Sequence, residues 1–283
     1  DQGGTVSGRL SYANPNLQQI PARNKEFGNK IRSLFLPEEG KQWGSFDYSQ
    51  QEPRLVAHYS SAIGQKLDGS EEFIQAYQDE SADFHQIVAD MAQISRTQAK
   101  TINLGLFYGM GKNKLSKELG ISKDKAEILL NQYNSRVPFV KKLAEAVTQS
   151  ASKFGFIRTI KGRKCRFDKW EPMTFGMNQA MNYNEAKANY GNNIRRAFTY
   201  KALNRLIQGS AADQAKQAMI DCYNAGFMPM LQIHDELCFS IYGDDDIIKI
   251  KKEMENSIEN LRVPFKVDVA KGTSWGETHD NDG

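Results

Sequence analysis

Two segments far apart in the chain carry carboxylates in surroundings that favour a bound cation. Asp47 ends the apolar run 43–46, which predicts a short strand with a carboxylate at its end. Asp235 and Glu236 lie at a predicted tight turn between two apolar strands. Adjacent carboxylates repel each other, so such a pair between apolar strands indicates a cation nearby. An ordinary turn aspartate at Asp47 and a solvent-exposed acidic turn at Asp235 are the alternatives.

A basic segment lies between these carboxylates in the sequence. Arg96, Lys100, Leu104 and Tyr108 recur at every fourth position, so in a helix they would share one side. Arg96 and Lys100 would then lie about 6 Å apart along the helix axis. A guanidinium fork and an ammonium point charge suit the oxygens of one polyphosphate. The alternative is a surface helix whose two cations fall four residues apart by chance.

Two rigid carboxylates from distant parts of the chain and a basic helix are the components of two-metal phosphoryl transfer. In such sites, ions about 3.5–4 Å apart activate the attacking oxygen and stabilise the leaving oxygen. The transferred phosphate needs cationic groups around it as well. The combination is therefore more specific than any one of the three segments.

The elements that must position these residues mix strands and helices without a strict βαβ alternation, which favours an α+β fold. Residues 168–200 are polar, rich in asparagine and tyrosine, and without a clear period, so we expect an irregular insertion there. The patterns predict strands at 43–47, 230–233, 236–239 and 264–269. They predict a helix that starts near Pro53, helices over 70–155 with breaks at Gly120 and Pro138, and helices at 202–224 and 244–260.

The bulk composition is that of an ordinary soluble globular protein, with 283 residues, 40% hydrophobic and 25% charged. No stretch approaches the roughly 20 apolar residues that span a bilayer, so we expect a cytoplasmic protein with no membrane partner. The net charge of +3 suits a nucleic-acid binder and many other enzymes equally. Three widely spaced cysteines form no CxxC pair, which predicts buried thiols and no zinc site.

In order along the chain, three segments resemble motifs A, B and C of family A DNA polymerases, the DNA polymerase I-like group. These segments are DYSQQEPRLVAH (47–58), RTQAKTINLGLFYG (96–109) and QIHDEL (232–237). Supporting matches are TVSGRLSYANPNLQQIP (5–21), ADFH (82–85), GRKCRF (162–167) and LNRLIQGSAAD (203–213). The resemblance covers nearly the whole chain, and a phage source would fit a compact polymerase of this kind.

The resemblance implies a catalytic metal site. Asp47 and Asp235 would be catalytic residues and metal ligands, helped by the backbone carbonyl of Tyr48. They would hold two Mg²⁺ ions, for which Mn²⁺ could substitute. Glu236 would lie beside the site without being an obligatory ligand.

The resemblance also implies contacts with both substrates, a deoxynucleoside triphosphate and primer–template DNA. Glu52 and Tyr108 would exclude a ribose 2′-hydroxyl, and Lys100 would be catalytic as well as phosphate-binding. His58 lies in no matching histidine position, so we expect it to be structural. The nucleotide-binding set would be Gln50, Glu52, His85, Arg96, Lys100, Leu104 and Tyr108. The primer–template set would be Arg9, Asn204, Gln208 and His234.

The chain departs from the family pattern at two residues. Leu104 stands where most members carry Phe or Tyr, so an aromatic platform for the nucleotide is missing. Pro53 replaces the usual Leu, and a first-turn position in a helix can accept it. Because a proline disfavours helical backbone at the preceding residue, we expect Glu52 to be extended.

The fold that the resemblance implies is a polymerase palm, an antiparallel sheet with helices, interrupted by helical fingers. The palm would comprise 1–69 and 201–283, and the fingers 70–200, with the motif B helix at about 96–109 and the polar insertion at about 168–200. Thumb and exonuclease domains would be absent from this chain. These domains would belong to a separate chain, or they would have been removed from this one or not included in it. The start at Asp1 instead of Met fits a fragment.

The expected function is DNA-templated DNA synthesis by two-metal-ion phosphoryl transfer in DNA replication. A single-subunit RNA polymerase shares the palm chemistry, but Glu52 and Tyr108 argue against it. A non-catalytic DNA-binding or assembly subunit derived from a polymerase is a further alternative. Such a subunit would have no chemical need for Asp47, Asp235 and the two cations of the basic helix.

Overall fold

The computed structural model describes residues 1–20, 25–62, 70–78, 83–107, 110–174 and 179–279. The chain forms two compact units. Unit 1 contains Asp1–Arg54 and Ala211–Gly283, and unit 2 contains Leu55–Ser210. Helices α2 (Gln51–Ala62) and α10 (Ala202–Asn224) each continue from one unit into the other.

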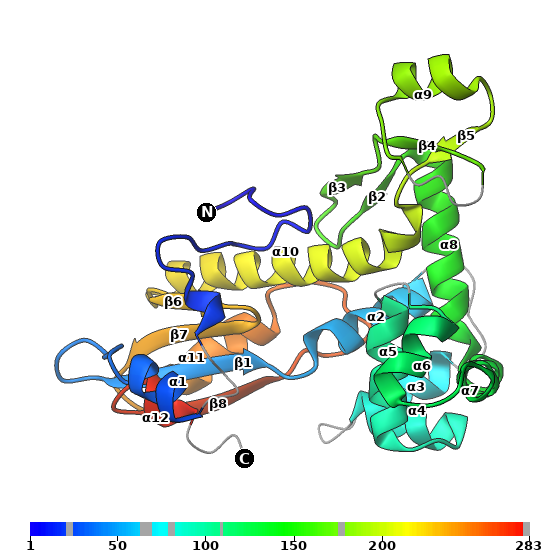
Figure 1. The fold of residues 1–283 in the computed structure, drawn as a ribbon. Helices are drawn as coiled ribbons and strands as arrows, with labels where there is room; N and C mark the ends of the chain where they lie inside the picture. The colour runs from blue at the N-terminus through cyan, green and yellow to red at the C-terminus, as the bar shows by residue number, and fades with distance from the viewer. Residues whose placement is uncertain (21–24, 63–69, 79–82, 108–109, 175–178, 280–283) are drawn as a thin grey trace. The chain divides into compact units, whose positions relative to one another are not determined.

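Unit 1 is built on a four-stranded antiparallel sheet (Figure 1). In spatial order its strands are β6 (Leu231–Ile233), β7 (Glu236–Ile241), β1 (Gln42–Tyr48) and β8 (Val267–Gly272). The unit also contains η1 (Leu17–Gln19), α1 (Lys25–Arg32), α11 (Asp244–Glu255) and α12 (Trp275–Thr278). The predicted hairpin at 230–239 is confirmed, with a turn of two residues between β6 and β7.

Strand β1 is covered on both faces, because successive side chains point to opposite sides of a strand. On one face, the Tyr48 hydroxyl donates a hydrogen bond of 2.7 Å to the Met254 carbonyl at the end of α11. On the other face, the Trp43 ring stacks on Trp275 of α12 at 6.5 Å. Asp47 has the same side-chain parity as Trp43, so α12 covers the face of the sheet that carries the carboxylate.

Unit 2 is mainly helical. Gly120 ends α6 in the left-handed conformation, with φ of 64°, and Pro138 begins α8, so both predicted breaks are confirmed. The helices are α3 (Ser70–Ala76), α4 (Phe84–Ala92), α5 (Arg96–Phe107), α6 (Lys112–Leu119), α7 (Lys123–Arg136), α8 (Pro138–Phe154) and α9 (Tyr183–Tyr190). The short strands and 3-10 helix are β2 (Phe156–Arg158), β3 (Lys164–Arg166), β4 (Trp170–Pro172), β5 (Ile194–Arg196) and η2 (Thr199–Lys201).

The expectation of an irregular segment at 168–200 is wrong, because β4, α9 and β5 all lie within it and η2 begins there. Asn182 caps α9 by accepting a hydrogen bond of 2.9 Å from the Glu185 backbone N–H. The Arg196 guanidinium lies 4.6 Å from the centre of the Trp170 ring across the β4–β5 pair. The two strands have three residues each, which is too short for a sequence period to be visible.

The expectation of an extended backbone at Glu52 is also wrong, since Glu52 is the second residue of α2. Pro53 lies in the first helical turn, where its missing N–H leaves no hydrogen bond unmade. The backbone changes direction at Gln50, directly before α2, where the φ angle is left-handed at 53°. The glutamate is therefore presented by a helix rather than by a loop.

Two predicted boundaries near the C-terminus shift by several residues. Helix α11, predicted at 244–260, ends at Glu255, and β8 begins at Val267 and not at 264. Pro264 cannot donate to a strand ladder, and its carbonyl instead accepts a hydrogen bond of 2.7 Å from the buried Arg54. The segment before β8 is therefore held by a side chain in place of strand pairing.

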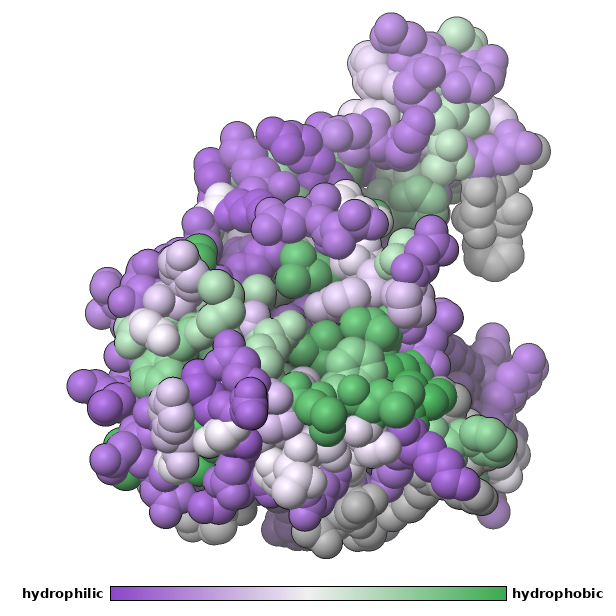
Figure 2. Space-filling model, turned by 90° about the vertical axis from the view of Figure 1, so that its left-hand side faces the viewer, coloured by the Kyte–Doolittle hydropathy of each residue, from purple (hydrophilic) through white to green (hydrophobic). Residues whose placement is uncertain are grey.

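The surface carries hydrophobic as well as polar residues. Figure 2 shows hydrophobic residues gathered on part of one side of the molecule. In unit 1, Phe27 of α1 and two residues of the segment between α1 and β1, Leu34 and Leu36, are exposed. All three cysteines are buried, as predicted. None of the described helices combines the length and the apolar character that crossing a membrane requires.

Candidate active site

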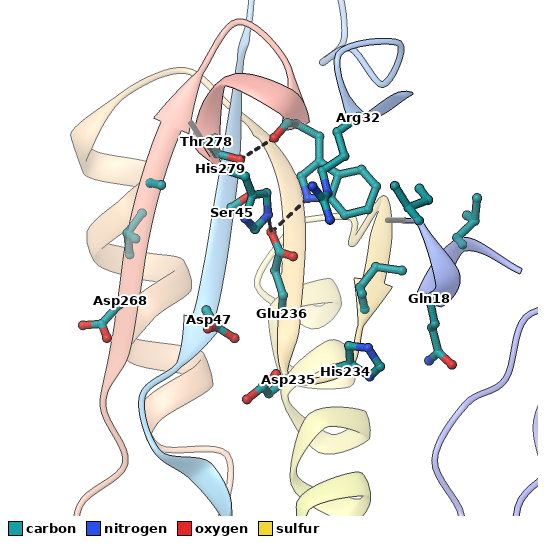
Figure 3. Close-up of a pocket in the computed structure, with 16 residues that line it drawn as sticks. Gln18, Arg32, Ser45, Asp47, His234, Asp235, Glu236, Asp268, Thr278 and His279 are labelled. Atoms are coloured by element: carbon teal, nitrogen blue, oxygen red, sulfur yellow. Dashed lines mark hydrogen bonds and ion pairs between the residues drawn. The ribbon is translucent and has the colours of Figure 1, made fainter. Parts of the chain in front are cut away.

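Strand pairing places a row of carboxylates across the sheet of unit 1. Asp47 on β1 lies opposite Glu236 on β7 and opposite Asp268 on β8. The Tyr48 backbone N–H donates to the Asp235 carbonyl at 3.4 Å, which ties the end of β1 to the β6–β7 turn. The two predicted metal ligands, Asp47 and Asp235, are therefore brought together by neighbouring backbone segments. Figure 3 shows both side chains beside the same cavity.

The electrostatics of Asp47 and Asp235 disfavour two negative charges. Loss of hydration, reinforced by the nearby Asp235, Glu236 and Asp268, raises the pKa of Asp47 to about 8, although its side chain reaches solvent. Loss of hydration also raises the pKa of Asp235. Because a divalent cation would remove this repulsion, the pair has the character of a metal-binding site.

Glu236 has a different environment from Asp47, although the two residues face each other. Its Oε1 accepts hydrogen bonds from Trp275 Nε1 at 3.2 Å and from Cys238 Sγ at 3.5 Å, and it lies 3.3 Å from His279 Nε2. Burial opposes ionisation of Glu236, but the interactions with His279 and Ser45 hold its pKa below the usual value. In Figure 3 its side chain extends toward His279.

A cavity of about 530 Å³ opens beside these carboxylates within unit 1. Asp47, Asp235, Glu236 and Asp268 all contribute to its wall. Among the residues that the structure describes, no three His, Cys, Asp or Glu side chains form a ready-made metal cage. A cation here would have to complete its coordination with water or a ligand in the cavity.

Four residues around the cavity were missed by the sequence analysis. Asp268 lies in a predicted strand, but nothing in its own segment indicates that this strand pairs with β1. Arg32, Trp275 and His279 also line the cavity and match no quoted motif. The cation–π contact of the Arg32 guanidinium with Trp275, at 5.4 Å, links two segments that are far apart in sequence.

Arg9 and Glu52, which we predicted to act on different substrates, form an ion pair in unit 1. Arg9 Nη2 lies 2.5 Å from Glu52 Oε1, and both side chains are partly buried. Burial raises the pKa of Glu52, while the Arg9 charge opposes the increase. His234, another predicted substrate residue of this unit, is exposed in the β6–β7 turn with a left-handed φ of 55°.

The predicted triphosphate-binding residues of unit 2 gather around α4 and α5. Arg96 and Lys100 are exposed on α5, and Arg96 makes hydrogen bonds of 2.9 and 2.6 Å to Asp83 Oδ2. Asp83 caps α4 and accepts a hydrogen bond of 2.8 Å from the His85 backbone N–H. The ion pair thus ties the start of α5 to the residue that orients His85.

The other predicted nucleotide- and DNA-binding residues are placed by the elements that carry them. Leu104 lies on α5, and Gln50 precedes α2. Tyr108 lies outside the described residues. Asn204 and Gln208, four residues apart on α10, share one side of that helix in unit 2. Unit 2 contains the predicted phosphate-binding residues Arg96, Lys100 and His85, whereas unit 1 contains Asp47 and Asp235.

Carboxylates presented by a small antiparallel sheet and cations presented by a mainly helical unit are the residue types that metal-dependent phosphoryl transfer requires. The sequence profile of DNA polymerase family A matches residues 1–277. The chain belongs to this family.

Individual relatives agree with the family assignment. The chain is 37% identical to a DNA-directed DNA polymerase of Pseudomonas phage M6, over 99% of this chain and 45% of that protein. It is 35% identical to DNA polymerase I of Caldicellulosiruptor bescii, over 98% of this chain and 31% of that protein.

A solved structure shows the same fold. The polymerase domain of Pol1 from M. smegmatis, in complex with DNA primer-template and dNTP, matches with a TM-score of 0.75 and 32% identity. The match covers 97% of this chain and 47% of that chain. The chain thus spans less than half the length of the proteins that it matches here.

Proposed function

We propose that this protein is a DNA-templated DNA polymerase that adds deoxynucleotides to a primer 3′ end during DNA replication. The observation that carries the proposal is the position of Asp47 and Asp235 at neighbouring strand ends beside an open cavity. The names of the relatives support the same function. The polymerase structure that the chain matches was solved with DNA and a nucleotide, which supports these two partners.

The donor atoms at the site fit magnesium. The Asp47 and Asp235 carboxylates and the Tyr48 carbonyl offer only oxygen, and Mg²⁺ prefers oxygen ligands and keeps several waters. When bound, two Mg²⁺ ions, or Mn²⁺ in their place, would activate the attacking hydroxyl and stabilise the leaving oxygen. Asp47 and Asp235 would hold the ions, whereas the hydrogen bonds of Glu236 to Trp275 and Cys238 keep its carboxylate to one side.

The incoming deoxynucleoside triphosphate would be bound by the residues that the family resemblance indicates. Arg96, Lys100 and His85 would bind its phosphates, and Lys100 would also stabilise the charge that develops during transfer. Phosphate oxygens would have to compete with Asp83 for the Arg96 guanidinium. Gln50 and Leu104 would shape the rest of the pocket.

Selection of the sugar would depend on Glu52 and Tyr108, which would occupy the space of a ribose 2′-hydroxyl. The glutamate is presented by the rigid first turn of α2 and is oriented by Arg9. Primer–template DNA would contact Arg9, Asn204, Gln208 and His234. This arrangement favours a DNA polymerase over an RNA polymerase.

The domain assignment follows from these roles. Residues 1–69 and 201–283 would form the palm, and residues 70–200 the fingers. The protein would act in the cytoplasm, or in the host cytoplasm if a phage encodes it. A separate chain that carries thumb and exonuclease domains stays a proposal, and it is tested by whether such a polypeptide co-purifies.

Primer extension with a dNTP mixture and Mg²⁺ tests the proposed function. Extension by the wild type and its loss in Asp235→Ala and in Asp47→Asn are the expected results. Exposed Asp245, in the first turn of α11, supplies a matched control, since Asp245→Ala should extend normally. Equal extension by Asp235→Ala and wild type would exclude the metal roles. No extension by the wild type, together with no stabilisation by dNTP and primer–template, would favour a non-catalytic subunit.

A further inference from the structure

A buried chain of hydrogen bonds links three helices of unit 2 and ends at His85. The Tyr133 hydroxyl on α7 donates to Asn103 Oδ1 on α5. The Asn103 Nδ2 lies 3.2 Å from Nδ1 of His85 on α4. Tyr133 and Asn103 are fully buried, and His85 is 9% exposed. Each donor in such a deeply buried chain must meet an acceptor, because an unpaired buried polar atom costs about 1–3 kcal/mol.

The direction of the chain follows from the chemistry of its first member. Complete burial raises the pKa of the Tyr133 phenol, so the group keeps its proton and donates. Asn103 can accept that hydrogen bond only through its carbonyl oxygen, which turns the amide NH₂ toward His85. Because the NH₂ group only donates, Nδ1 of His85 must present a lone pair. The ring proton then resides on Nε2.

The charges around His85 agree with a neutral ring. Burial lowers the pKa of His85, Lys100 and Arg96 on α5 lower it further, and Asp83 opposes them. The backbone N–H of His85 is held by Asp83 Oδ1 at 2.8 Å. Both the backbone and one ring nitrogen are therefore fixed, which leaves the ring one orientation.

We propose that Tyr133 and Asn103 are positioning residues that hold His85 as the neutral Nε2–H tautomer, ready to donate one hydrogen bond to the triphosphate of the incoming nucleotide. The inference rests on the proposed role of His85 in nucleotide binding. Arg96 and Lys100 supply the positive charge, and His85 adds a directed donor whose proton does not depend on the pH near neutrality. Neither Tyr133 nor Asn103 touches the nucleotide in this arrangement.

Nitrogen-15 NMR of the histidine side chains tests the tautomer without any need for activity. The wild type should show His85 with a protonated Nε2 and an unprotonated Nδ1 at pH 7.5. Tyr133→Phe deletes only the hydroxyl, so the Asn103 amide can turn and the His85 signals should shift toward a mixture of tautomers. A wild-type His85 that carries its proton on Nδ1, or on both nitrogens, would overturn the proposal.

Kinetics test the consequence for the nucleotide. Tyr133→Phe should raise KM for dNTP about fivefold, with a smaller change in kcat and no change in DNA affinity. In a His85→Ala background the same substitution should have no further effect on KM. An additive effect there would mean that Tyr133 acts by general destabilisation and not through His85.

Tyr59→Phe is the matched control in the same unit, because the Tyr59 hydroxyl bonds Ser210 Oγ at 2.7 Å. It should alter neither KM nor the His85 signals. If the wild type does not polymerise, the NMR result still decides whether the hydrogen-bond chain exists. An active wild type in which Tyr133→Phe leaves KM unchanged would overturn the inference and leave the proposed function intact.

Discussion

Asp47 and Glu236 face each other across strands β1 and β7, yet their pKa values shift in opposite directions. Glu236 is buried but accepts hydrogen bonds from Trp275 and Cys238 and lies beside His279. Asp47 instead faces other carboxylates. The same sheet therefore holds one carboxylate that stays ionised and one whose charge a cation would stabilise, and this difference supports the different roles proposed for them.

We expect the stability of the metal-free protein to fall as pH rises from about 5 to 8. The raised pKa of Asp47 means that folding favours its protonated form, so its stabilising contribution is complete below the unfolded-state pKa of about 3.9 and is lost as pH rises through about 8. The change should be modest because Asp47 reaches solvent. Thermal unfolding in EDTA across this pH range measures it.

Magnesium and the Asp47→Asn substitution serve as controls for that pH dependence. Mg²⁺ should restore the melting temperature at pH 8, and Asp47→Asn should flatten the dependence and reduce the effect of Mg²⁺. A melting temperature that rises with pH in EDTA would show that Asp47 is ionised without a cation.

Trp275→Phe should destabilise the fold, because it removes the indole N–H that donates to the buried Glu236. The loss of this one hydrogen bond should account for about 1–2 kcal/mol. A double-mutant cycle with Glu236→Gln in urea unfolding separates the hydrogen bond from lost packing. A coupling energy near zero would show that Trp275 stabilises the fold through its packing contacts and not through this hydrogen bond.

Glu52→Ala should raise ribonucleotide incorporation relative to deoxynucleotide incorporation by about 10- to 100-fold. The substitution opens the space proposed for exclusion of the 2′-hydroxyl, and it also releases Arg9 from its ion pair. The ratio of kcat/KM for rNTP and dNTP measures it. Arg9→Ala breaks the same pair without opening that space, so an equal change in both variants would contradict a gating role for Glu52.

Leu104→Phe should raise the rate of nucleotide incorporation, because an aromatic ring on α5 would restore a platform for the sugar and base. Single-turnover kinetics at saturating dNTP measure the incorporation step itself. Leu104→Met changes the shape without adding a ring, so it should leave the rate near the wild-type value. Equal rates in all three proteins would rule out the missing platform as a cause of slow incorporation.

Local sequence determined much of what positions the site. The sequence predicted the strand that carries Asp47, the basic helix from Arg96 and the hairpin around Asp235, because the signals for each lie within a few residues of one another. Gly120 ended a helix and Pro53 lay in the first turn of one, as expected, since a left-handed φ and a fixed φ are local constraints, although Pro53 did not make Glu52 extended. The motif order then identified the family.

Only the tertiary structure decided which side chains became partners. Asp268 joins the carboxylate row because β8 pairs with β1, and Trp275 reaches Glu236 because α12 covers that face of the sheet. The pairing of Arg9 with Glu52 and the chain from Tyr133 to His85 likewise join residues that are distant in sequence. Strand register and helix packing set these contacts, and both depend on which surfaces the whole fold buries, which no short window of sequence records.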